Sequence, residues 1–74
     1  MRPELKEVFL DVLDVDSIAE TDSVETIESW DSVRHLNLIL AIEERFGFTF
    51  EADEIPALIS VKAIQSALDR RVAQ

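Results

Sequence analysis

The segment from Ser32 to Phe46 constrains the fold more than any other part of the chain. Set at steps of about 100° along an α-helix, its apolar side chains cover well over half of the circumference. The remaining polar strip is narrow and consists of Arg34, Asn37, Glu44 and Arg45. Gly47 follows directly, and a glycine just past the last turn commonly ends a helix. We therefore expect a central helix over residues 32–46 that contacts more than one neighbour.

A second amphipathic pattern lies at the start of the chain. Apolar residues recur there at helical spacing, at Leu5, Val8, Phe9, Val12 and Leu13. Pro3 suits the first turn of a helix, where the missing N–H costs nothing. This pattern predicts a helix over residues 3–13.

The last third of the chain predicts two further helices. Asp53 is expected to cap a short helix over residues 54–59, and Ser60 is expected to cap the last helix. The apolar stripe of the last helix is Val61, Ile64, Leu68 and Val72. The prediction is an all-α fold, a small antiparallel four-helix bundle with three main helices and one short helix.

Length and charge limit the classes of function. The chain has 74 residues, so we expect a single domain over residues 1–74. Sixteen acidic residues against seven lysines and arginines give a formal net charge of −9, which disfavours nucleic acid and anionic membranes as partners. There is no cysteine, and no apolar run approaches the roughly 20 residues of a membrane span. We expect a monomeric, cytoplasmic, acidic domain that meets positively charged surfaces.

An acidic connection runs from Asp14 to Asp31. Connections longer than about 12–15 residues are uncommon in small domains and are often functional. Apolar residues are scattered along it and should pack it against the core: Val15, Ile18, Val24, Ile27 and Trp30. Its acidic spacing partly matches a calcium-binding EF-hand loop, but Ile18 and Ala19 stand where a ligand and a glycine are needed. We therefore predict no metal site.

The pair Asp31-Ser32 at the start of the central helix has more than one interpretation. Ser32 could cap the helix, a contribution of about 1 kcal/mol. Alternatively, its hydroxyl could be presented at a helix N-terminus, where an attached phosphate is favoured. A hydrolytic Asp31, Ser32 and His35 set is disfavoured, because the three crowd onto one helical turn without a glycine-rich elbow. Trp30 is interpreted as a core anchor and His35 as a half-exposed helix residue.

An ordered set of short motifs favours the interpretation of Ser32 as a functional residue over that of a capping residue. Asp31-Ser32-Val33 opens the long helix, Glu43-Glu44 and Phe46-Gly47 close it, and Ser60-Val61 starts the last helix. With the chain length, the charge and the long first connection, this set resembles an acyl carrier protein over nearly the whole chain.

The resemblance implies a function for Ser32. It would carry 4′-phosphopantetheine, transferred from coenzyme A by a phosphopantetheinyl transferase. The terminal thiol would hold an acyl or aminoacyl group as a thioester. An acyl- or aminoacyl-loading ligase would supply that group, and downstream transferases or synthases of fatty-acid, polyketide or other specialised biosynthesis would use it. The domain itself would catalyse nothing, and its working sulfur would be imported.

The sequence also departs from the family pattern. Val33 replaces the usual leucine, and Arg34 and Asn37 stand where fatty-acid carriers usually have acidic residues. A cation beside the modified serine changes the electrostatic match to partner enzymes. These departures favour a specialised discrete carrier over the housekeeping one. A peptidyl or aminoacyl carrier, an unmodified acidic interaction module and a calcium-responsive bundle remain as alternatives.

Overall fold

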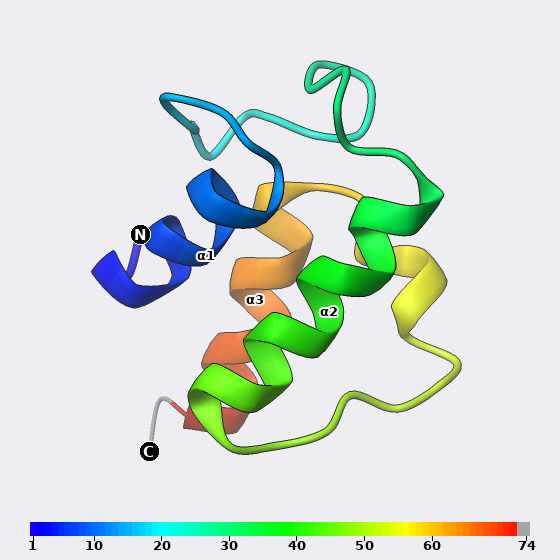
Figure 1. Ribbon diagram of the computed structural model, residues 1–74. Coiled ribbons are helices and arrows are strands. Elements are labelled where there is room, and N and C mark those ends of the chain that lie inside the picture. Colours follow the sequence, from blue (N-terminus) through cyan, green and yellow to red (C-terminus); the bar gives the residue numbers. More distant parts are fainter. Residues whose placement is uncertain (73–74) are drawn as a thin grey trace.

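Three α-helices form the framework of the domain: α1 (Pro3–Val12), α2 (Ser32–Phe46) and α3 (Val61–Val72). The computed structural model describes residues 1–72, and none of these residues forms a strand. Figure 1 shows the three helices packed together, with the long connection between α1 and α2 crossing one end of the domain. No helix of the described residues is long and apolar enough to cross a membrane.

Helix α1 confirms the predicted first helix and ends one residue earlier. Pro3 is its first residue, as expected. The chain leaves α1 through Asp14, which has a left-handed φ of 56°. The N–H of Val15 then donates to the carbonyl oxygen of Leu10 at 3.2 Å, which satisfies one of the free carbonyls of the last turn.

Helix α2 has the bounds that the sequence predicts. Gly47 follows its last residue, and the left-handed φ of 74° there suits a residue without a β-carbon. The buried side of α2 consists of Leu38, Ile39 and Ile42. These residues share one core cluster with residues of α1 and α3, as expected for a central helix. Part of the wide apolar side of α2 nevertheless faces solvent, at Val33, Leu36 and Leu40.

The predicted short helix over residues 54–59 is instead a single 3-10 turn, η1 (Ile55–Ala57). The residue that precedes it is Glu54, and Asp53 does not cap it, so that prediction is wrong. Glu54 organises the turn: its carboxylate accepts the N–H of Glu51 at 2.8 Å and pairs with Arg71 of α3. The structure therefore shows three helices and one turn.

The apolar core is continuous across all these elements. Its buried members from the helices include Leu5, Val8, Phe9, Leu38, Ile39, Ile42, Val61, Ile64 and Leu68. The side chain of Val72, predicted as the end of the last stripe, lies outside the described residues. The long connection is packed down as predicted, with Ile27 and Trp30 buried and with Val15, Ile18 and Val24 against the core.

A short backbone pairing joins the long connection to the start of α3. The N–H of Val24 donates to the carbonyl of Ile59, and the N–H of Val61 donates to that of Asp22, both at 3.0 Å. Ser60 caps α3 as predicted, since its hydroxyl accepts the N–H of Ala63 at 3.1 Å. This pairing places the segment before α3 alongside the long connection.

Candidate functional site

The N-terminus of α2 is capped by Asp31 and not by Ser32. Asp31 has extended backbone angles, and its Oδ1 accepts the N–H of Arg34 at 2.8 Å. Ser32 is the first helical residue, and its hydroxyl makes no hydrogen bond to any residue that the structure describes. The capping interpretation of Ser32 is therefore wrong, and the helix does not need this hydroxyl.

Ser32 lies at the edge of an open hollow of about 380 Å³. The residues around it come from three segments: Val24, Asp31, Ser32, His35, Leu36 and Ile59. The backbone bond between Val24 and Ile59 makes these two residues one wall, and the first turns of α2 form the other. The serine is exposed to solvent on the α2 side.

Two backbone donors accompany the exposed hydroxyl. The N–H of Arg34 is used by the Asp31 side chain, and the N–H of His35 donates to the Asp31 carbonyl at 2.8 Å. The N–H groups of Ser32 and Val33 have no acceptor within the described part of the chain. Unpaired N–H groups at a helix N-terminus favour an anionic oxygen. The surroundings of Ser32 therefore fit a phosphate ester.

Asp31, Ser32 and His35 do not form a nucleophilic relay. The Asp31 carboxylate is turned to the Arg34 N–H, and both ring nitrogens of His35 have other partners. Nδ1 accepts from Nε1 of Trp30 at 3.1 Å, and Nε2 lies 3.2 Å from the carbonyl oxygen of Ile55. The imidazole is therefore not placed to take a proton from Ser32.

Trp30 fixes the chain immediately before the site. Its indole is only 4 % exposed and lies 5.9 Å from the ring of Phe9 of α1, centroid to centroid. Ser29 adds a second anchor by donating its hydroxyl to the carbonyl of Leu13 at 2.6 Å. The predicted core role of Trp30 is confirmed. Its bond to His35 was missed, because no periodicity links residues five positions apart.

The surface next to Ser32 is apolar, although the whole chain is acidic. Three exposed side chains of α2, Val33, Leu36 and Leu40, are 58–68 % exposed, and Ile59 across the hollow is 48 % exposed. The α2 sequence contains no acidic residue before Glu43. Arg34 makes no ion pair within the described part. The surface beside Ser32 is therefore apolar and carries one positively charged side chain, that of Arg34.

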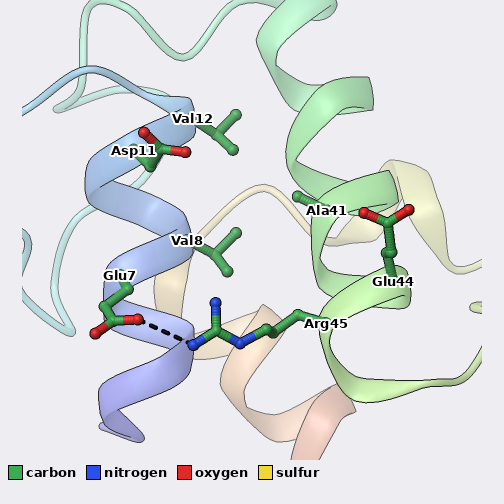
Figure 2. A pocket seen from close by; sticks show the side chains of 7 residues that line it. All are labelled: Glu7, Val8, Asp11, Val12, Ala41, Glu44 and Arg45. Atoms are coloured by element: carbon green, nitrogen blue, oxygen red, sulfur yellow. Dashed lines mark hydrogen bonds and ion pairs between the residues drawn. The ribbon is translucent and has the colours of Figure 1, made fainter.

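A second hollow, of about 500 Å³, lies between α1 and α2 and does not include Ser32. Figure 2 shows Val8 and Val12 of α1 facing Ala41 of α2 there. Arg45 reaches across and pairs with Glu7 at 3.0 Å (Figure 2). This exposed ion pair links α1 and α2. The residues that line this hollow include no serine, threonine, lysine or histidine that could act as a nucleophile.

Two acidic side chains outside the hollows, Glu43 of α2 and Asp22 of the long connection, accept hydrogen bonds within the fold. Glu43 accepts the backbone N–H of Phe50 at 2.8 Å. In the long connection, the two carboxylate oxygens of Asp22 accept from the Ala19 N–H and from the Thr26 hydroxyl. No group of three or more possible metal-ligating side chains comes together in the described residues.

Comparison with known proteins gives no family assignment. No protein-family model matches the chain, and a search of curated proteins returned no match. The function proposed below therefore rests on the sequence motifs and on the surroundings of Ser32.

Proposed function

We propose that this chain is a carrier domain of the acyl-carrier type, with 4′-phosphopantetheine attached to Ser32. The proposal rests on one observation at the start of α2: Asp31, and not Ser32, caps the helix. This cap leaves the Ser32 hydroxyl exposed and without a hydrogen-bond partner among residues 1–72. A serine at a helix N-terminus that has no part in stabilising the helix is available for modification by another enzyme.

Attachment requires little of the chain itself. The Ser32 oxygen would attack the pyrophosphate of coenzyme A, the phosphoanhydride bond would break, and 3′,5′-adenosine diphosphate would leave. The transferase would supply the metal ion and the base that takes the hydroxyl proton. The N–H groups of Ser32 and Val33, which have no acceptor within the described part of the chain, would be available to donate to the phosphodiester oxygens.

The attached group would supply a thiol that holds acyl or aminoacyl intermediates as thioesters. The chain contributes the apolar hollow beside Ser32, whose walls include Leu36 and Ile59. Apolar walls favour the burial of an acyl chain at about 25 cal/mol per Å² of apolar surface. In this proposal the three helices and η1 correspond to the four-helix bundle of the carrier family.

The surface chemistry favours a specialised carrier. Arg34 and Asn37 replace the acidic residues of fatty-acid carriers. The exposed neighbours of these two residues, Val33 and Leu36, are apolar. Such a surface suits a dedicated loading ligase rather than enzymes with strongly basic docking patches.

One observation supports a second candidate, an unmodified interaction module. The exposed stripe of Val33, Leu36 and Leu40 could bind a partner protein with no group on Ser32. This candidate predicts partner binding that is unaffected by Ser32→Ala.

The test uses the chain, coenzyme A and a broad-specificity phosphopantetheinyl transferase, followed by intact mass measurement. Wild type should gain the mass of one phosphopantetheinyl group, and Ser32→Ala should gain none. Ser66→Ala is the matched control, because Ser66 is an exposed serine on α3 and should not affect the gain. A gain that persists in Ser32→Ala would contradict the proposal.

A further inference from the structure

His35 joins three segments beside Ser32 through a single side chain. Its Nδ1 lies 3.1 Å from Nε1 of Trp30, and its Nε2 lies 3.2 Å from the carbonyl oxygen of Ile55. An indole N–H can only donate, so Nδ1 must be the acceptor. In the neutral ring the proton therefore sits on Nε2 and is donated to the Ile55 carbonyl.

The carbonyl of Ile55 is the closing point of η1. It also accepts the N–H of Leu58 at 3.1 Å, and the next residue is Ile59, which forms a wall of the hollow. Ile59 in turn accepts the N–H of Val24, the other member of that wall. The bond from His35 to Ile55 therefore ties the segment that leads into this wall directly to the first turns of α2.

No other bond duplicates this one at the Ser32 end of α2. Within the described residues, the segment from Thr49 to Ser60 has one further hydrogen bond to α2, between the Phe50 N–H and the Glu43 carboxylate. That bond lies near the opposite end of the helix. The two hydrogen bonds of the His35 ring, to Trp30 and to Ile55, together form what we call the His35 bridge. Its Trp30 end is held in place, because Trp30 is buried and packs against Phe9.

We propose that His35 is a positioning residue for Ser32, whose Nε2–H bond to Ile55 holds the wall of Val24 and Ile59 in place beside the hydroxyl. The bond itself is independent of any modification. Its importance for chemistry at Ser32 rests on the proposed function. The sequence pattern indicates only a half-exposed helix residue at His35.

Two substitutions separate the two ring nitrogens. His35→Asn can place an amide near Nδ1 and keep the Trp30 bond, but it does not reach Ile55. His35→Gln can place its amide N–H near Nε2 and keep the Ile55 bond, but it gives up the bond to Trp30. Each variant is the control for the other, because each loses one hydrogen bond from the same position.

The primary readout is amide hydrogen exchange in the unmodified protein. Exchange of Leu58 and Val24 is compared with that of Leu13, whose N–H donates to Phe9 and reports on α1. In His35→Asn, Leu58 and Val24 should exchange about fivefold faster relative to Leu13, and in His35→Gln less than about twofold faster. Equal changes in the two variants would overturn the proposal.

A measurement on the wild type keeps the proposal testable if a variant does not fold. Nitrogen-15 chemical shifts of the imidazole distinguish the two neutral tautomers. The structure predicts the proton on Nε2 and a nitrogen acceptor at Nδ1. A ring with its proton on Nδ1 would exclude the bridge.

Modification of Ser32 is scored on the same three proteins. With the transferase and coenzyme A, the initial rate should fall at least about threefold in His35→Asn and stay near wild type in His35→Gln. If the two variants are modified at equal rates although their amide exchange at Leu58 and Val24 differs, the positioning role of His35 is overturned. If no protein, including wild type, is modified, the proposed function fails, while hydrogen exchange still decides whether the bridge exists.

Discussion

Replacement of Asp31 should destabilise the domain far more than replacement of its neighbour Ser32. The Asp31 side chain accepts the N–H of Arg34 at 2.8 Å, whereas the exposed Ser32 hydroxyl has no bond within the described part. Loss of a capping residue costs about 0.5–2 kcal/mol, and loss of an acidic charge at a helix N-terminus costs about 0.3–1 kcal/mol. We expect about 1.5 kcal/mol for Asp31→Ala and less than about 0.5 kcal/mol for Ser32→Ala.

Asp31→Asn divides the effect into its parts. Asparagine caps helices about as well as aspartate but carries no charge, so it should cost only about 0.5 kcal/mol. Urea unfolding followed by circular dichroism measures the free energy of unfolding of each variant, and equal m-values make the comparison valid. For a domain of 74 residues, the loss in Asp31→Ala corresponds to a decrease in Tm of about 6–12 °C.

One result would refute the reasoning about the cap. If Ser32→Ala lowers the free energy of unfolding as much as Asp31→Ala, the hydroxyl is holding the helix after all. The structural argument that Ser32 is left over for modification would then fail. The same Ser32→Ala protein, if stable, shows that any loss of modification is not a loss of folding.

Three further perturbations test the packing of α2 and α3, the helices that support the site. Leu38→Ala, at a fully buried position of α2, should lower the free energy of unfolding in urea by about 2–5 kcal/mol. A loss below about 1 kcal/mol would contradict the burial of this face of α2. Gly47→Ala meets no atom within 4 Å, so its expected cost of about 1–2 kcal/mol comes from the left-handed backbone alone. Arg71 pairs with Glu54 and lies over the Phe50 ring, so Arg71→Ala should cost about 1–3 kcal/mol, and Arg71→Lys should recover little of the loss.

The helices that hold the site were predictable because local signals define their ends. Pro3 marks the start of α1, and Gly47 marks the end of α2. The short helix was not predictable in the same way. Next to its 3-10 turn, Glu54 pairs with Arg71 of α3, a contact between residues 17 positions apart that no local pattern indicates. The sequence pattern also showed how wide the apolar side of α2 is, but not which part neighbours would cover.

The candidate site was predictable only in part, for two physical reasons. Asp31 and Ser32 are both good capping residues, and the choice between them depends on a one-residue difference in where helical angles begin. The bridge from Trp30 through His35 to Ile55 requires the folded arrangement of three segments. The resemblance to carrier proteins directed attention to Ser32, and the structure supplied the reason why that hydroxyl is available.

The intact mass of the protein, isolated from the cells that naturally make it, tests the central claim most directly. The account predicts the mass of the chain plus one phosphopantetheinyl group, located on Ser32 by fragmentation, with or without a thioester-bound cargo. A chain that carries no such group in its natural cells, and that also stays unmodified with coenzyme A and an active transferase, would contradict it.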